Sequence, residues 1–294
     1  TGMNMLKTGT LFLFLTFLLL LTGYLIGGVG GILFFLVISV VMNFLGYWFS
    51  DKMVLAMARA KEATPEDTPE LHRVVEEQVR LAGIPKPRVF IIESDSPNAF
   101  ATGRSKRHAS IAATRGILRI LDREELGAVL AHELAHVGNQ DTLIMTMVAT
   151  VAGAISMIAS VAQWSMIFGG GRRDRNASPA GMIGLLVVVI VMPLAALLIR
   201  LAISRTREYQ ADKTGALTSG RPMALANALR KLQRGTQARP LDIPKERLET
   251  VSHLFIVNPL RGDGLVALFS THPPLEERIR RLEAMQYQSL WPDR

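Results

Sequence analysis

Cysteine is absent from this sequence of 294 residues. Without cysteine the chain forms no disulfide bond and builds no zinc site from thiolates. Any zinc ion bound by this protein must therefore be held by histidine and carboxylate side chains. Histidine is scarce too, with six residues in the whole chain. A pattern that places two of these six on one face of a helix is therefore informative.

Charged residues are absent from a long stretch near the start of the chain. No Asp, Glu, Lys or Arg occurs between Lys7 and Asp51. As one straight helix this stretch would measure about 64 Å, roughly twice the thickness of a bilayer core. The glycine-rich segment 27–31 is typical of a turn, so we expect a transmembrane hairpin over residues 8–49, with spans at about 8–26 and 32–49. Tyr47 and Trp48 would anchor the second span at the membrane interface.

Two further uncharged stretches follow the middle of the chain. They cover residues 142–171 and 176–199, and the polar loop 172–175 separates them. Each stretch is long enough to cross a membrane, which predicts a second hairpin over residues 142–199. A buried helical hairpin in a soluble core is the alternative. Because 49% of all residues are hydrophobic, we expect an integral membrane protein with four transmembrane helices.

The net charge of +8 indicates which side of the membrane the polar segments face. No basic cluster is interleaved with aromatic residues, so we expect no nucleic-acid partner. With four spans, both termini and both polar segments lie on one side, and most Lys and Arg residues near the span ends lie there too. Three arginines in the loop 172–175 weaken this bias without reversing it. Positive charge stays cytoplasmic, so the polar segments and both termini should be cytoplasmic.

The polar segments 51–141 and 200–294 have the patterns of one α+β domain that the second hairpin divides in two. Strands are expected at residues 88–93, 99–103 and 109–114, which would form a small β-sheet. A basic hairpin, residues 104–108, joins the last two strands. Helices are expected at residues 68–82, 203–217, 222–232 and 274–285. Loops are expected at residues 235–244 and 258–264.

The motif His132-Glu133-Leu-Ala-His136 predicts a metal site on a helix. Residues four apart share one helical face, so both imidazoles can bind one metal ion. Glu133 stands beside them and can take a proton from a water molecule, the arrangement of a zinc hydrolase. Asp122 and Glu125 form a capping pattern at the start of this helix. The alternative is a pair of core histidines that are satisfied by other polar groups.

A third ligand is expected from the second polar segment. A catalytic zinc ion usually has three protein ligands, which here would be His132, His136 and Glu208 with one zinc ion per chain. Glu208 comes just after the end of the fourth span, and the helix of the motif comes just before the third span. A hairpin formed by these two spans would therefore bring the two helices to the same depth relative to the membrane. Asp212, one turn later, is placed to accept the free ring N–H of a ligating histidine. Alone, the segment 205–208 would be interpreted as a solvent-facing charge cluster.

Four motifs together resemble those of one known family. They are His132-Glu-Leu-Ala-His136, Arg207-Glu208-Tyr-Gln-Ala-Asp212, Asn98-Ala-Phe100-Ala-Thr-Gly103 and Thr271-His272-Pro-Pro274. With two spans before the first of these and two after it, the chain resembles the HtpX-type integral membrane zinc metalloproteases, relatives of the CAAX prenyl endopeptidases. The resemblance implies a gluzincin-like fold with Glu208 as third ligand and Glu133 as general base. It also implies quality control in a bacterial inner membrane, by cleavage of misfolded or damaged membrane proteins at the cytoplasmic face.

The resemblance also implies roles for residues outside the metal site. Asn98, Ala99 and Phe100 would form the edge strand beside the cleft and bind substrate. His272 would help to hold substrate or the tetrahedral intermediate, although a plain helix start equally explains its prolines. The remaining histidines have no partner motif and are expected to be surface or satisfied residues: His72, His108 and His253.

Two other functions stay open. One is a prenyl-protein-type zinc endopeptidase with a narrow substrate, which should have more spans around its site. The other is a membrane zinc-binding protein without catalysis. Glu133 argues against the second, because a structural zinc site needs a fourth ligand and no base. The expected partners are the lipid bilayer and unfolded or membrane protein substrates, and whether the chain is a monomer or a homo-oligomer stays open.

Overall fold

The computed structural model describes residues 2–150, 205–260 and 273–290. Most of the second predicted hairpin, including the loop 172–175, lies outside the described residues. So does His272, and so does the end of the loop expected at residues 258–264.

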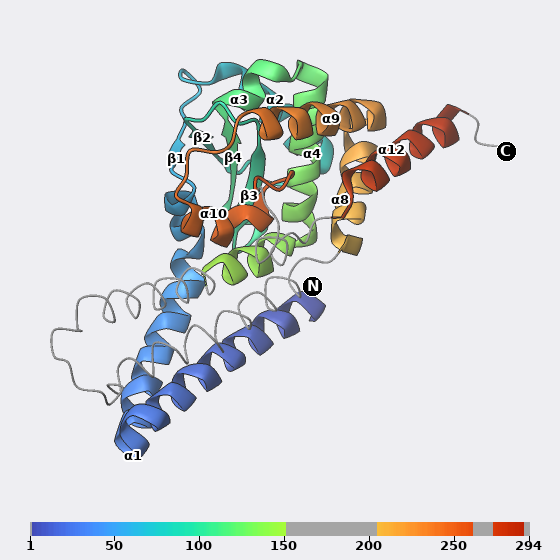
Figure 1. Ribbon diagram of the computed structural model, residues 1–294. Helices are drawn as coiled ribbons and strands as arrows, with labels where there is room; N and C mark the ends of the chain where they lie inside the picture. Colours follow the sequence, from blue (N-terminus) through green and yellow to red (C-terminus); the bar gives the residue numbers. More distant parts are fainter. Residues whose placement is uncertain (1, 151–204, 261–272, 291–294) are drawn as a thin grey trace.

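Helix α1, Gly2–Met57, folds back on itself (Figure 1). The break is at Gly28, whose φ of +56° suits glycine. Past it, Asn43 Nδ2 donates to Thr16 Oγ1 at 2.9 Å, although 27 residues separate the two in sequence. The arm Gly28–Met57 is the one helix in the described ranges that is long and apolar enough to cross a membrane. Four transmembrane helices are thus not confirmed.

The sheet has four strands in the order β1-β2-β4-β3. They are β1 Ala60–Glu62, β2 Arg88–Ile92, β3 Ala99–Gly103 and β4 Ala109–Thr114. The central pair β2 and β4 is parallel and both outer pairs are antiparallel, with Ala101 of β3 opposite Ile111 of β4. Strand β1 was not expected from the sequence, because three residues are too few for an alternating pattern. Strand β3 is an edge strand, as expected.

The helices between α1 and residue 150 begin and end where local signals place them. Helix α2, Pro69–Ala82, has proline in its first turn and ends at Gly83 in the left-handed conformation. The short helix α3, Arg115–Ile120, follows β4 directly. Helix α4, Arg123–Asn139, opens with the expected capping box, in which the Asp122 side chain accepts from the Glu125 backbone and the Glu125 side chain accepts in return. An apolar helix, Asp141–Thr150, begins after the single residue Gln140 that follows α4.

The described α-helices after residue 204 are α8 Arg205–Ser219, α9 Pro222–Ala238, α10 Lys245–Val251 and α12 Leu275–Leu290. The loop expected from residue 235 was wrong at its start, because α9 continues through Gly235 and Thr236. Gly235 lets the helix lie close to Pro97, whose Cγ would be 2.4 Å from an added Cβ. Thr236 also donates to the Pro97 carbonyl at 3.1 Å. Helix α10 was not expected.

Helices and sheet enclose two apolar cores on the two faces of the sheet. Val89, Ile91 and Ile111 pack with α2, α4 and α9 on one face. Phe90 and Phe100 face the other side, toward Phe255 and the C-terminal end of α1. This alternation along the strands fixes the register of the sheet. It also sets α4 beside the edge strand β3.

Candidate metal centre

Helix α4 carries both histidines of the motif into the interior. His132 and His136 are 1% and 3% exposed. Their rings are one turn apart and nearly perpendicular, with centroids 4.9 Å from each other. The apolar residues around them, among them Leu130 and Leu134, are fully buried in the core. The helix thus presents two imidazoles side by side in a space closed to bulk water.

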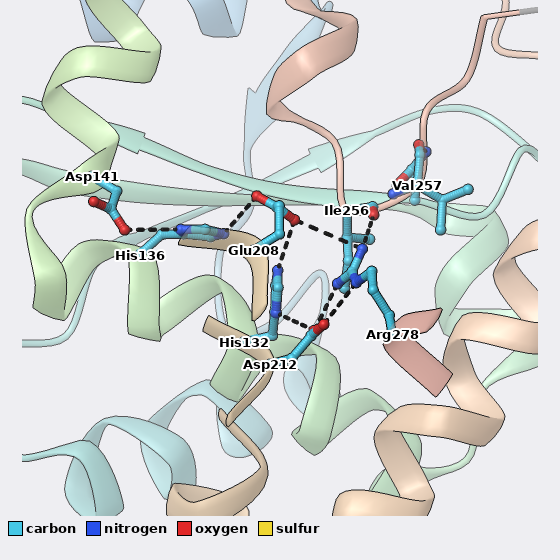
Figure 2. Close-up of polar contacts among 9 residues, drawn as sticks. His132, His136, Asp141, Glu208, Asp212, Ile256, Val257 and Arg278 are labelled. Atoms are coloured by element: carbon cyan, nitrogen blue, oxygen red, sulfur yellow. Dashed lines mark hydrogen bonds and ion pairs between the residues drawn. The ribbon is translucent and has the colours of Figure 1, made fainter. Parts of the chain in front are cut away.

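Helix α8 lies directly against α4 at this point. Gly215 makes the close approach possible, because an added Cβ would be 2.7 Å from the His132 backbone nitrogen. This packing brings the buried Glu208 between the two rings (Figure 2). Its Oε1 is 3.4 Å from His136 Nε2, and its Oε2 is 3.8 Å from His132 Nε2. The expected third ligand therefore lies where the sequence places it.

The three side chains fit a metal ion. One ligand atom from each of His132, His136 and Glu208 lies within 4.8 Å of the other two. Ligands bound tetrahedrally to zinc at about 2.0–2.1 Å are roughly 3.4 Å apart, so these atoms need little movement. His132 Nε2 is buried and has no hydrogen-bond partner in the described part of the chain. A buried nitrogen without a partner, facing a carboxylate, is what a bound cation would satisfy.

Asp212 holds the other ring nitrogen of His132. The Asp212 Oδ1 atom lies 3.0 Å from His132 Nδ1. Behind it, Arg278 on α12 donates to both carboxylate oxygens of Asp212 at 2.8 Å and to the Ile256 carbonyl at 2.9 Å. Although burial opposes ionisation, Arg278 lowers the pKa of Asp212 to about 2. The expected role of Asp212 fits this position, while Arg278 was missed.

Asp141 holds the other ring nitrogen of His136 and was also missed. Gln140 adopts a left-handed conformation with φ of +61°, and the chain then turns so that Asp141 Oδ2 lies 3.3 Å from His136 Nδ1. Arg207 lies behind Asp141 at 3.9 Å. Each predicted ligand histidine is therefore backed by a carboxylate, and each carboxylate by an arginine. Such partners orient the ring and fix which nitrogen faces a metal ion.

Glu133 stands beside the three ligand side chains without joining them. It is buried, and its Oε1 has no hydrogen-bond partner among the described residues. Burial raises the pKa of Glu133 to about 8, helped by the nearby charge of Glu208 and opposed by His136 and by a hydrogen bond to the backbone of Ala101. The carboxylate thus lies between the three candidate ligands and the edge strand β3. This is the position for a proton acceptor acting on a group held against β3.

The two histidines differ in their affinity for a proton. Burial lowers the pKa of His132. Burial also works against protonation of His136, but its hydrogen bond to Asp141 and the charge of Glu208 outweigh that effect and raise its pKa to about 9. A metal ligand must be the neutral imidazole, so a metal ion would displace a proton from His136.

The residues expected to bind substrate lie on β3 and are enclosed. Asn98, Ala99 and Phe100 are all fully buried. The Ile256 N–H donates to the Ala99 carbonyl at 3.0 Å, and Asn98 Nδ2 donates to the Val257 carbonyl at 2.7 Å. Phe100 packs edge-on against Phe255 with ring centroids 5.1 Å apart. Substrate binding by these residues stays a prediction.

The histidines without a partner motif have ordinary roles. His72 is buried and its Nε2 is 2.9 Å from the Ala63 carbonyl. His253 is buried with its Nε2 3.1 Å from the Met145 carbonyl. His108 is exposed and pairs with Ser105. These expectations are confirmed. The expected role of His272 lies outside the described residues.

The sequence matches known proteins over most of its length. The family model described as Peptidase family M48 matches residues 65–286. A Protease HtpX homolog of Pyrococcus furiosus is 52% identical over 276 residues, which make up 94% of this chain and 94% of that protein. A Protease HtpX homolog of Desulfatibacillum aliphaticivorans is 51% identical over 286 residues, covering 97% of this chain and 91% of that protein.

A solved structure has a similar fold. The crystal structure of S. mikatae Ste24p matches with a TM-score of 0.51 and 22% sequence identity, covering 96% of this chain. The chain spans 66% of the length of that protein. At this identity the likeness concerns the fold alone.

Proposed function

The chain belongs to peptidase family M48, and from this membership and the geometry of the site we propose that it is a zinc-dependent metalloendopeptidase set in a membrane. One observation supports zinc hydrolysis above all. His132, His136 and Glu208 converge on one point, and a buried carboxylate that is not part of this set, Glu133, lies beside them. A purely structural site would offer a fourth ligand and would need no such base.

His132, His136 and Glu208 would hold the zinc ion. When bound, zinc supplies the Lewis acidity that lowers the pKa of a water molecule to about 7 and polarises a carbonyl group. Asp212 and Asp141 keep the two imidazoles in the orientation that presents Nε2 to the site.

Glu133 acts as the general base and then as the general acid. It accepts a proton from water as the oxygen attacks the peptide carbonyl carbon, and it delivers this proton to the leaving amine. Burial raises its pKa, and the charge of a bound zinc ion would lower the pKa, so that the carboxylate is ionised before the attack. By the family resemblance, we assign His272 to hold the carbonyl oxygen as negative charge develops on it.

We propose that substrate lies extended along the outer edge of β3. Backbone hydrogen bonds to an edge strand give affinity with little dependence on sequence, which suits a protease that removes unfolded proteins. Ala101 is the residue of this edge that faces Glu133. Asn98, Ala99 and Phe100 would set the end of the bound segment, where Ile256 and Val257 contact the strand.

We further propose a multi-pass protein of a bacterial inner membrane with four transmembrane helices. The apolar arm Gly28–Met57 supports this placement, since large apolar side chains such as Leu33, Phe34 and Val37 are more than 60% exposed along it. The excess of positive charge on the polar segments favours a cytoplasmic site and cytoplasmic termini. In that position the enzyme would cleave misfolded or damaged membrane proteins as part of protein quality control.

The proposal is tested with the full chain purified in detergent. Casein and an unfolded membrane protein serve as substrates, and a prenylated peptide tests the narrow-substrate alternative. With zinc, we expect cleavage of both proteins at many positions. A chelator should stop the reaction and added zinc should restore it. Cleavage that continues unchanged in chelator would contradict a zinc enzyme, and cleavage of the prenylated peptide alone would favour the narrow-substrate alternative.

A further inference from the structure

The basic hairpin, residues 104–108, joins β3 to β4 and has no part in the metal site. Its sequence is Arg104-Ser-Lys106-Arg107-His108 and contains no acidic residue. The Lys106–His108 stretch forms one turn of 3₁₀ helix. Arg107 and His108 are exposed, while Arg104 and Lys106 are partly covered.

Arg104 fixes the position of the basic hairpin relative to the apolar arm of α1. Its guanidinium carbon lies 4.7 Å from the centroid of the Trp48 ring, and its Nη1 donates to the Trp48 carbonyl at 3.4 Å. Trp48 is 45% exposed and packs edge-on against Tyr47. A cation resting on an indole face holds the two groups together even where water has access.

Trp48 also marks a depth in the membrane. Tryptophan and tyrosine gather at the level of the lipid headgroups, and the arm changes here from uncharged residues to Asp51 and Lys52. Lys52 Nζ lies 5.4 Å from the centroid of the Phe49 ring, on the same stretch of the arm. If the arm spans a membrane, as proposed above, the basic hairpin lies at headgroup level.

The cations of the basic hairpin differ from those at the opposite end of the sheet. Arg115 pairs with Glu93 at 3.1 Å, and Arg119 pairs with Asp95. No ion pair joins Arg104, Lys106 or Arg107 to a carboxylate within residues 2–150, 205–260 and 273–290. Asp51 supplies one negative charge at this end of the arm. Positive charge is thus in excess where the chain meets the membrane surface.

We propose that the basic hairpin binds the phosphate groups of anionic phospholipids in the leaflet that the arm Gly28–Met57 enters. This inference rests on the membrane placement in the proposed function. Basic side chains next to a membrane segment are attracted to anionic headgroups, and each strengthens binding by roughly fivefold. Because the basic hairpin is continuous with the edge strand β3, a bound lipid would brace the strand that faces Glu133.

Two double variants test the proposal with the same change in net charge. Lys106→Gln with Arg107→Gln removes two cations of the basic hairpin. Arg115→Gln with Arg119→Gln removes two cations at the other end of β4, about 20 Å away by the rise of a strand. Both pairs include exposed cations, and folding is checked by circular dichroism and zinc content. The single variant Lys106→Gln, with roughly a fivefold loss expected, replaces the first pair if that pair fails to fold.

Lipid binding is measured by native mass spectrometry of the full chain in uncharged detergent. Phosphatidylglycerol and phosphatidylcholine are titrated separately. We expect the wild type to prefer phosphatidylglycerol, the hairpin variant to lose about 25-fold of this preference, and the control variant to keep it. An unchanged preference in the hairpin variant, or equal losses in both variants, would overturn the proposal. Competition by inorganic phosphate or polyglutamate at concentrations equal to that of the lipid would overturn it too.

A flotation assay separates this inference from the proposed function. The wild type and both variants should float with neutral phosphatidylcholine vesicles, because the apolar arm inserts without help from charge. If they float but show no phosphatidylglycerol preference, the lipid site is wrong while the membrane enzyme stands. If the wild type does not float, the membrane placement is wrong, and the lipid site fails with it.

Discussion

His132 and His136 lie one turn apart on α4, yet the carboxylates that contact their Nδ1 atoms come from two different parts of the molecule. Asp212 holds His132 at 3.0 Å and is itself fixed by two 2.8 Å bonds from Arg278. Asp141 holds His136 at 3.3 Å and has Arg207 at a looser 3.9 Å. The first arrangement joins the helices α4, α8 and α12. The second begins the apolar helix Asp141–Thr150, which packs on the arm of α1 at Gly46.

This difference means that the two candidate ligand histidines are held with different rigidity. The His132 arrangement is rigid, because a two-bond contact between a buried arginine and a carboxylate leaves little freedom. The His136 arrangement depends on where the apolar helix lies. A change in the position of this apolar helix should therefore reach His136 through Asp141 before it reaches Asp212.

The largest expected effect comes from breaking the tighter arrangement. Arg278→Met leaves the Asp212 charge buried without its partner, which typically costs about 3–5 kcal/mol. The free energy of unfolding of the metal-free protein in detergent should fall by that amount. Zinc affinity should fall as well, because His132 loses its fixed orientation.

Arg207→Met is the matched control. Its guanidinium is 3.9 Å from Asp141, and its two terminal nitrogens are buried without a hydrogen-bond partner among the described residues. Because the cost of burying this charge offsets much of its attraction to Asp141, the loss should be clearly smaller than in Arg278→Met. Equal losses in the two variants would remove the distinction between the arrangements.

The next effect is a difference in pH dependence. Against the effect of burial, Asp141 and Glu208 raise the pKa of His136 to about 9. Because the pKa of His136 is higher in the folded protein than the value of 6.5 in the unfolded chain, its protonation stabilises the folded state fully below pH 6.5. This stabilisation is lost as the pH rises through 9. Zinc-free protein should lose about 3 kcal/mol of stability between these pH values. Denaturant unfolding at pH 6 and pH 9.5 measures the loss.

Two variants show which carboxylate causes this pH dependence of stability. Asp141→Asn should remove most of it, whereas Asp212→Asn should leave it, because the pKa of Asp212 is near 2 and its contribution is lost only in acid. The Glu133→Gln background removes the parallel contribution of Glu133, whose pKa is raised to about 8. An undiminished slope in Asp141→Asn would show that Asp141 does not control His136.

A smaller effect is expected on metal affinity. Asp212→Asn and Asp141→Asn should each weaken zinc binding by about 10–100-fold, with the larger loss at Asp212. Competition with a chromogenic chelator measures both constants. Excess zinc should restore cleavage in both variants, since neither aspartate takes part in the chemistry. A variant that binds zinc normally but stays inactive would contradict a purely orienting role.

The centre of the site could be predicted from the sequence, because the motif and its helix have local signals. The spacing of His132 and His136 sets them on one helical face, and the capping box at Asp122 marks where that helix starts. Glu208 could be placed from the length of the apolar stretches. Asp141 was not found, because the left-handed turn at Gln140 that folds it back depends on tertiary packing.

Arg278 was also missed, although a signal was present. It lies among three arginines of one helix, and it alone shares the apolar face of Leu275, Ile279 and Leu282. An arginine on such a face is buried and needs a carboxylate partner. Gly215 carried no signal, since its role is set by contact with a helix more than 80 residues away in sequence. In the fold, the short strand β1 and helix α10 had too few residues for a periodic pattern.

The central claim is that Glu133 performs the chemistry while His132, His136 and Glu208 hold the metal. Measuring zinc content and casein cleavage together in Glu133→Gln and Glu208→Gln tests it most directly. Glu133→Gln should keep about one zinc ion per chain and lose about 10²–10⁴-fold in rate, because an amide accepts no proton at neutral pH. Glu208→Gln should lose most of its zinc. Full cleavage by zinc-loaded Glu133→Gln would contradict the assignment of the base, and full zinc content in Glu208→Gln would contradict the assignment of the third ligand.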